Sequence, residues 1–176
     1  MKKSSIYYGS IVGRRLGRIW VATSARGLVA VEFGVSRTDF EYLLGRSSGA
    51  AICYAPRRVR TAALQIWEYL AGKRRLFSIT IDWSILASPF QRTALKAVIA
   101  IPYGRTRTYT QIARKIGRPL AARAVGRANA TNPMPLVIPC HRVVGMDGSL
   151  RGYGGAGGQH TKAWLLKLES SHAGPS

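Results

Sequence analysis

Acidic residues are scarce in this chain of 176 residues. Asp and Glu together number 7, against 27 Lys and Arg, which gives a formal net charge of +20. Such an excess attracts a polyanion, and nucleic acid is the natural partner, because each phosphate that Lys or Arg neutralises releases a counterion. An anionic membrane surface and a basic protein without any such partner are the alternatives. The charge is spread along the chain, so it does not locate a site.

Cysteine is also scarce, and long apolar runs are missing. The two cysteines, Cys53 and Cys140, are too few for a disulfide framework or a Cys-rich zinc site, and we expect no metal. Lys2 and Lys3 are not followed by an apolar run, which argues against a signal peptide or membrane span. We therefore expect a cytoplasmic protein without a membrane partner, in a reducing compartment where a free thiol survives. A monomer is the default expectation.

Residues 1–82 read as a small N-terminal α/β domain. Residues 6–33 contain short apolar runs, at 19–22 and 28–31, that are typical of strands on either side of a turn at 24–27. Further elements are predicted for this part of the chain: a helix from near Thr38, as its cap, to Gly45, a helix over residues 60–70 that Gly72 ends, and a strand over residues 76–81. Cys53, between Ile52 and Tyr54 and with no His nearby, is predicted to be structural, like a buried thiol.

After Trp83 the pattern becomes mainly helical. The first of these helices has Ser88 as its cap and Pro89 in its first turn, and it ends at residues 102–104. The others are predicted from near Thr108 to Ile116, from Leu120 to about Ala130, and over residues 162–169. Two helices joined by a turn at residues 117–119 have the outline of a helix-turn-helix, although many such corners bind nothing.

The helix that follows this turn is built almost entirely from small residues. Only Arg123, Val125 and Arg127 have larger side chains between residues 121 and 130, apart from Asn129. Alanine favours helices, which is one explanation. A face of small residues also lets a helix backbone approach another surface closely, and with two projecting arginines it would suit a DNA groove.

Residues 131–158 show no helical or strand periodicity and are rich in Pro and Gly. Apolar residues at 136–138 and 143–144 argue against disorder, so a functional loop is the better interpretation. Within it, Cys140 is followed by His141 and Arg142, which offer a base and a positive charge to a thiol whose ordinary pKa is about 8.5. Either Asp147 or Glu169 could orient the imidazole, since no other acid follows residue 82. A bare Cys-His pair is more often a buried thiol beside a surface His, but this one stands between a helix-turn-helix candidate and a Gly-rich loop.

The segment 132–144, with Pro139-Cys140-His141-Arg142 at its centre, resembles the active-site segment of the O6-alkylguanine-DNA alkyltransferases, also called methylated-DNA–protein-cysteine S-methyltransferases. Further matches lie at 88–92, 101–104, 108–109, 121–126 and 152–169, so the resemblance is firm over 83–169 and loose over 1–82. It implies an α+β fold: an N-terminal ribonuclease H-like domain over 1–82, then a mainly α winged helix-turn-helix domain over 83–176.

The resemblance also implies roles in chemistry. Cys140 would be the nucleophile, His141 would activate it through a water, and Glu169 would orient His141. Asn132 would hold the turn before the active-site loop. Tyr109 would hydrogen-bond guanine N3 and crowd the backbone phosphate.

Other residues would contact DNA or form the pocket. Arg123 would fill the gap that a flipped-out base leaves, and the helix would enter the minor groove, which is about 6 Å wide and admits only small side chains. By the resemblance, Ala121, Ala122, Gly126 and Arg127 of this helix also contact DNA. The pocket would be formed by Pro135, Tyr153, Val143, whose carbonyl with that of Cys140 would read the guanine amino group, and Ala156, whose backbone would bind O6.

One departure concerns the loop 154–158, which is about two residues longer than the family pattern, so Gly154 is the alternative to Ala156. A wider loop would tolerate bulkier alkyl groups. The zinc site that some members carry in the N-terminal domain lacks its cysteines here.

The implied activity is the irreversible transfer of an alkyl group from O6-alkylguanine in double-stranded DNA to Cys140, without a cofactor and once per molecule, with O4-alkylthymine as a further candidate substrate. Three alternatives remain: a damage sensor without a nucleophile, which Cys140 argues against, a plain DNA-binding regulator, and a cysteine hydrolase that turns over without DNA.

Overall fold

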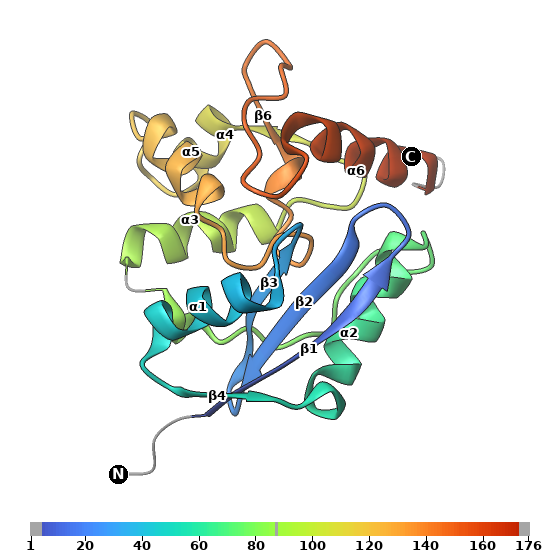
Figure 1. The fold of residues 1–176 in the computed structure, drawn as a ribbon. Coiled ribbons are helices and arrows are strands. Elements are labelled where there is room, and N and C mark those ends of the chain that lie inside the picture. Colours follow the sequence, from blue (N-terminus) through green and yellow to red (C-terminus); the bar gives the residue numbers. More distant parts are fainter. Residues whose placement is uncertain (1–4, 87, 173–176) are drawn as a thin grey trace. The chain divides into compact units, whose positions relative to one another are not determined.

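A computed structural model of the chain describes residues 5–86 and 88–172 (Figure 1). It is a mixed α/β protein with a small sheet and helices, and it divides into two compact units, one on each side of Ile85 and Leu86. The two units are described in turn.

The first unit is built on a four-stranded sheet with the strand order β3-β2-β1-β4. Its strands are β1 (Ser5–Gly13), β2 (Gly17–Ser24), β3 (Gly27–Phe33) and β4 (Ala51–Tyr54). The first three form an antiparallel meander, and β4 pairs parallel to β1. The predicted strands over 6–33 and the turn at 24–27 are confirmed. β4 was not predicted, since only Ile52 and its exposed neighbours form it and the apolar signal is weak.

The strand predicted over 76–81 is wrong. Ile81 alone forms a bridge to Leu28, in which the Leu28 amide donates to the Thr80 carbonyl at 2.8 Å. The segment is extended, but most of it lies beside the sheet without a ladder of hydrogen bonds, so alternation in the sequence reflects contact and not pairing.

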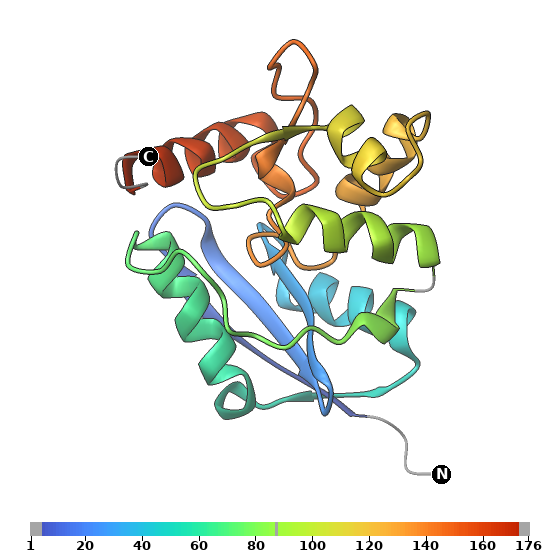
Figure 2. The same ribbon diagram turned by 180° about the vertical axis from the view of Figure 1, so that it is seen from behind.

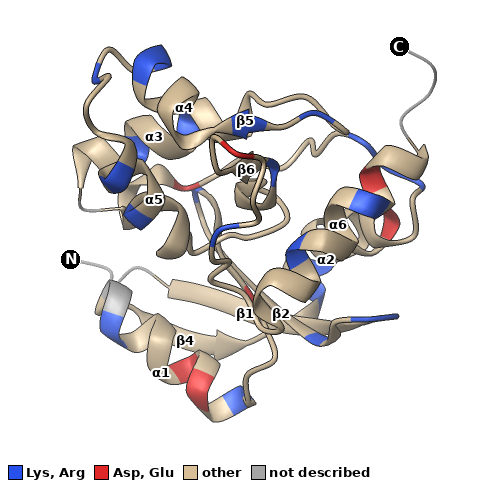
Figure 3. Cartoon of the chain, turned by 90° about the horizontal axis from the view of Figure 1, so that it is seen from above, with Lys and Arg blue, Asp and Glu red and all other residues tan. Residues whose placement is uncertain are grey.

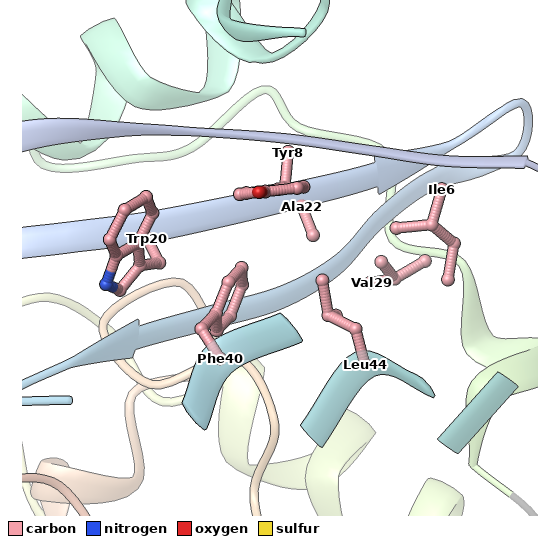
Figure 4. Close-up of a cluster of buried hydrophobic side chains, with 7 residues drawn as sticks. All are labelled: Ile6, Tyr8, Trp20, Ala22, Val29, Phe40 and Leu44. Atoms are coloured by element: carbon pink, nitrogen blue, oxygen red, sulfur yellow. The ribbon is translucent and has the colours of Figure 1, made fainter. Parts of the chain in front are cut away.

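Helices α1 (Arg37–Ser48) and α2 (Pro56–Leu70) cover opposite faces of this sheet. Figure 4 shows Phe40 and Leu44 of α1 against Tyr8 and Trp20, and the Phe40 and Trp20 rings are stacked with centroids 5.9 Å apart. Successive side chains of a strand alternate between faces, so Gly9, next to Tyr8, faces α2. A Cβ on Gly9 would lie 2.7 Å from Pro56 Cα, so glycine permits the close packing of helix and strand.

Both helix boundaries needed correction. The cap of α1 is Ser36 and not Thr38, because the Ser36 hydroxyl accepts from the Asp39 amide at 3.1 Å. The helix also continues past Gly45 to a left-handed cap at Gly49, with φ 58°. Helix α2 begins at Pro56, four residues before the predicted start, since proline is well tolerated in a first turn.

The second unit is mainly helical (Figure 2). Its elements are α3 (Pro89–Ile99), β5 (Arg107–Thr108), α4 (Tyr109–Lys115), α5 (Ala122–Ala130), the 3-10 turn η2 (Cys140–Arg142), β6 (Val143–Val144) and α6 (Gly158–His172). The predicted caps Ser88 and Thr108 are confirmed, and Thr108 forms a reciprocal capping box with Gln111. Helices α3, α4 and α5 pack on one another, and α3 and α6 both contact η2.

The boundaries of the last two helices differ from the prediction. Helix α5 begins at Ala122 and not Leu120, since Ala121 is its cap and Leu120 is fully exposed. Helix α6 begins at Gly158, ahead of the predicted Lys162. The loop between them contains the short parallel pair of β5 and β6, which its irregular sequence did not indicate.

The apolar residues of this loop are buried, as predicted from its composition. They are Leu136, Val137, Ile138, Val143 and Val144. None of the helices within the described ranges has the length and apolar character that crossing a membrane requires.

Candidate functional site

The segment that leads from α5 to Cys140 is held by the side chain of Asn132. Its Nδ2 donates to the Ile138 carbonyl at 2.9 Å, and its Oδ1 accepts from the Met134 amide at 3.0 Å. Within this turn Leu136 has a φ of +74°, an unfavourable conformation for a buried branched side chain. The backbone is therefore constrained immediately before the thiol.

Cys140 is the first residue of η2 and is buried, with 5% of its surface exposed. Burial raises the pKa of the thiol, although a hydrogen bond from Asn132, the charge of Lys162 and two backbone amides oppose the rise. The thiol is therefore neutral at rest and needs a base when it reacts. Cys53, by contrast, is exposed on β4, so its interpretation as a buried structural thiol is wrong.

His141 and Glu169 form a pair that is completely buried, with His141 Nε2 and Glu169 Oε1 2.8 Å apart. Burial lowers the pKa of His141 below its ordinary 6.5, against the opposing effect of Glu169. Burial by itself would raise the pKa of Glu169, but His141 and Arg142 outweigh it and hold that pKa at about 2. An ionised carboxylate only accepts hydrogen bonds, so Nε2 of a neutral His141 carries the proton and Nδ1 is the basic nitrogen.

Arg142 is bound to the same carboxylate. Its Nε lies 2.9 Å from Glu169 Oε2, its Nη2 lies 2.9 Å from Oε1, and its Nη1 donates to the Ile101 carbonyl at 2.5 Å. The Gly104 amide also donates to Glu169, at 2.9 Å. The expectation that Arg142 supplies a positive field to the thiol therefore needs revision, since its charge is matched by Glu169.

The second candidate acid, Asp147, lies in an exposed turn, where its Oδ1 accepts from the amide and hydroxyl of Ser149 at 3.1 and 2.7 Å. Of the two acids that the sequence left open, Glu169 is the one that contacts His141.

Sequence reasoning missed Lys162. This side chain on α6 is fully buried, and its Nζ donates to the carbonyls of Val143 at 2.6 Å and Arg151 at 3.1 Å. Burial lowers the pKa of Lys162, while interaction with Cys140 raises it, so the lysine is the positive group that acts on the thiol. A signal was available: Lys162, Leu165 and Glu169 are spaced to share one helix face, and they are the buried residues of α6.

A pocket of about 510 Å³ lies between α5 and the loop after β6. It is lined by Tyr109, Ala122, Arg123, Gly126, Ala130, Arg151, Gly152, Tyr153 and Gly154. Five of these were predicted site residues: Tyr109, Ala122, Arg123, Gly126 and Tyr153. Burial raises the pKa of Tyr109, and the nearby Cys140 raises it further while Arg151 lowers it, so Tyr109 links the pocket to the thiol.

The other predicted residues lie outside the pocket wall. Pro135 and Val143 are buried, Ala121 is half-buried, and Arg127 is exposed on α5. Ala156 is exposed and its carbonyl accepts from Thr161 Oγ1 at 2.7 Å. Its alternative, Gly154, lines the pocket, and a Cβ there would lie 2.5 Å from the Ala130 carbonyl oxygen. The geometry therefore favours Gly154 over Ala156 at the pocket.

Metal binding has no support in the described ranges, 5–86 and 88–172, where no three His, Cys, Asp or Glu residues are grouped so that they could hold an ion.

Comparison with known proteins identifies the family. Residues 89–171 match the family model of the 6-O-methylguanine DNA methyltransferase DNA-binding domain. A methylated-DNA–protein-cysteine methyltransferase from Methanosarcina barkeri is 39% identical over 165 residues, 94% of this chain and 98% of the relative. An inducible one from Bacillus subtilis is 35% identical over 164 residues, 92% of this chain and 89% of the relative.

A solved structure agrees with these sequence matches. The crystal structure of Mycobacterium tuberculosis OGT in complex with DNA superposes with a TM-score of 0.79 at 37% identity, covering 95% of this chain and 94% of that one. The chain therefore belongs to the family of methylated-DNA–protein-cysteine methyltransferases.

Proposed function

We propose that this protein repairs double-stranded DNA by moving the alkyl group of O6-alkylguanine onto Cys140, once per molecule. The observation that carries the proposal is the buried thiol of Cys140, which is followed by a His141–Glu169 pair and interacts with Tyr109 in the pocket wall. A structural relative crystallised with DNA supports the choice of substrate.

In the proposed reaction Cys140 first loses its proton to His141 Nδ1 through a water, and Glu169 stabilises the imidazolium. The sulfur then attacks the alkyl carbon, so an S–C bond forms as the C–O6 bond breaks and its electron pair stays on guanine. Tyr109 hydrogen-bonds the departing guanine at N3, and the proton taken from the thiol returns to the base. The thioether product is not hydrolysed by water, so the thiol is consumed.

The positive charge of Lys162 would support this step. Its interaction with Cys140 favours the thiolate as it forms, and its hydrogen bonds to two carbonyls keep the ammonium in place. Because burial raises the thiol pKa at rest, we expect deprotonation to accompany substrate binding and not to precede it.

Reaching the alkyl carbon requires base flipping, since O6 lies inside the duplex. A pocket of about 510 Å³ has the size of a small-molecule site and is lined by exposed Arg123 together with the small residues Ala122 and Gly126. We propose that α5 enters the minor groove and that Arg123 fills the gap in the stack.

The finer fold assignments belong to this proposal as well. The α4–turn–α5 arrangement, with Gly117 at φ 70°, supports a helix-turn-helix, and the paired β5 and β6 support its winged form. The mixed sheet β3-β2-β1-β4 supports a ribonuclease H-like first unit. All proposed reacting groups lie within residues 109–169, so one copy of the chain would suffice.

Intact mass spectrometry after incubation with a duplex carrying O6-methylguanine tests the proposal. We expect a gain of one methyl group, located on Cys140, that stops at one per molecule. A folded protein that gains no mass would refute the proposal, and turnover without DNA would indicate a hydrolase. A duplex with O4-methylthymine tests the second candidate substrate in the same assay.

Base flipping has a separate test. Arg123→Ala should slow transfer from duplex DNA more than reaction with free O6-benzylguanine, because the free base leaves no gap to fill. Equal losses would contradict the stacking role.

A further inference from the structure

Two arginines line the pocket, and only one of them has a role so far. Arg123 belongs to α5, whereas Arg151 lies in the loop after β6, on the same wall as Tyr153. The Arg151 side chain is 66% exposed, so its guanidinium lies toward solvent at the pocket.

The backbone of Arg151 is held firmly. Its carbonyl accepts from the buried Lys162 at 3.1 Å, and its amide donates to the Ser149 carbonyl at 2.9 Å. The lysine that acts on Cys140 therefore also fixes the residue that presents this guanidinium. The position is part of the built site and not of a loose surface loop.

The side chain of Arg151 is oriented but not used up. Its Nη2 lies 3.4 Å from Asp147 Oδ2, and Asp147 is itself held by Ser149 through its other oxygen. Both side chains of this ion pair are mostly exposed, so the pair is weak. A guanidinium has five N–H donors, of which Asp147 engages one, so the others can bind a further anion.

We propose that Arg151 is a phosphate-binding residue, which holds a backbone phosphate next to the nucleotide that enters the pocket. The inference rests on the proposed function, since it needs a nucleotide in this pocket. Guanidinium groups bind phosphate oxygens through paired hydrogen bonds. The phosphates of an extruded nucleotide stay at the rim, because they remain joined to the duplex backbone.

The other source of an anionic oxygen is a carboxyl-bearing alkyl group on guanine O6. That group must lie against Cys140, which is 5% exposed, whereas the Arg151 side chain is 66% exposed. The difference in burial favours the phosphate.

Phosphate binding would also act on Tyr109. The charge of Arg151 lowers the pKa of Tyr109. A phosphate that neutralises this charge would let that pKa rise, and so would keep the Tyr109 hydroxyl protonated as a donor to the guanine.

The test combines a side-chain change with a change in the DNA. Single-turnover methyl transfer is measured for the wild type, Arg151→Ala, Arg151→Lys and the control Lys167→Ala, which removes one exposed charge from α6 outside the pocket. The duplexes carry O6-methylguanine and either native linkages or one neutral methylphosphonate on the 5′ or the 3′ side of the lesion.

We expect Arg151→Ala to slow transfer at limiting enzyme concentration about tenfold, as for one charge-assisted hydrogen bond, with Arg151→Lys intermediate and Lys167→Ala near the wild type. On one of the two methylphosphonate duplexes the wild type should fall to the rate of Arg151→Ala, and the variant should lose nothing more. Reaction with free O6-benzylguanine should be unchanged in Arg151→Ala.

Three results would overturn the inference. An undiminished difference between wild type and Arg151→Ala on both methylphosphonate duplexes would show that neither phosphate is the ligand. An equal loss with the free base would indicate pocket shape. A loss confined to O6-carboxymethylguanine would assign the arginine to the alkyl group. A wild type that transfers no methyl from any substrate would instead refute the proposed function itself.

Discussion

The two units of this chain bury different kinds of side chain. Among the described residues of the first unit, the interior is apolar and aromatic, with Phe40 packed on Tyr8 and Trp20 and few buried polar groups. The second unit buries four ionisable side chains beside its thiol: His141, Arg142, Lys162 and Glu169. Basic residues otherwise lie over both units, as Figure 3 shows.

The difference teaches where the second unit is vulnerable. Removing charges from water is unfavourable, and buried charges are tolerated only when each is paired and hydrogen-bonded. Glu169 meets this condition for two neighbours at once, because it binds both His141 and Arg142. An apolar core tolerates loss of a partner by degrees, whereas this cluster depends on every member.

The two thiols give the largest expected contrast. Cys140→Ala should abolish methyl transfer while the variant still binds DNA, since the nucleophile is gone. Cys53→Ala, on an exposed strand of the first unit, should transfer at the wild-type rate. Intact mass after incubation with O6-methylguanine duplex measures both, and transfer by Cys140→Ala would show that another group is the acceptor.

Removing the buried carboxylate should have the next largest effect. Glu169→Gln leaves Arg142 buried without its counter-charge and should destabilise the protein by about 3–5 kcal/mol. The matched control is Glu68→Gln, which breaks the half-exposed Glu68–Arg74 pair of the first unit and should change stability by less than about 1 kcal/mol. Urea denaturation measures both, and similar values would mean that the buried cluster has no special importance.

Acid should act through the same carboxylate. The folded pKa of Glu169 is about 2, below its ordinary value of 4.5, so its contribution is fully present above pH 4.5 and is lost as the pH falls toward 2. The shift corresponds to about 3 kcal/mol. The difference in unfolding free energy between wild type and Glu169→Gln should shrink over this window, and a constant difference would contradict the assignment.

His141 adds to the acid sensitivity at higher pH. Its folded pKa lies below the ordinary 6.5, so the folded state resists protonation and stability begins to fall as the pH drops below 6.5. Replacing His141 by Gln should remove this part of the pH dependence of unfolding while abolishing its role as a base.

The smallest effects should come from two helix caps, one in each unit. Ser36 caps α1 and Ser88 caps α3, each through a hydroxyl that accepts from a backbone amide at 3.1 or 3.2 Å. Ser36→Ala and Ser88→Ala should each cost about 1 kcal/mol. Hydrogen exchange should show faster opening of α1 in the first variant and of α3 in the second. If each variant accelerated exchange equally in both helices, the two units would unfold as one.

Much of the local structure could be predicted because its causes are local. The caps Ser88 and Thr108 and the turn at Gly117 are set by side chains within a few residues of the helices that they begin or end. The cap of α1 was misplaced by two residues because Ser36 and Thr38 can both play that part, and only the observed hydrogen bond decides between them. The segment 76–81 was misread because alternation reports contact with a sheet but not the pairing of strands.

The sequence by itself determined that this is a basic protein with a thiol followed by His and Arg in a Pro- and Gly-rich loop, and its motifs indicated the family. Only the tertiary structure decided which groups surround that thiol. It chose Glu169 over Asp147 as the partner of His141, turned Arg142 toward the same carboxylate, and brought Lys162 to Cys140. The physical reason is that buried charges are paired across long stretches of chain, so their partners follow from packing and not from nearby sequence.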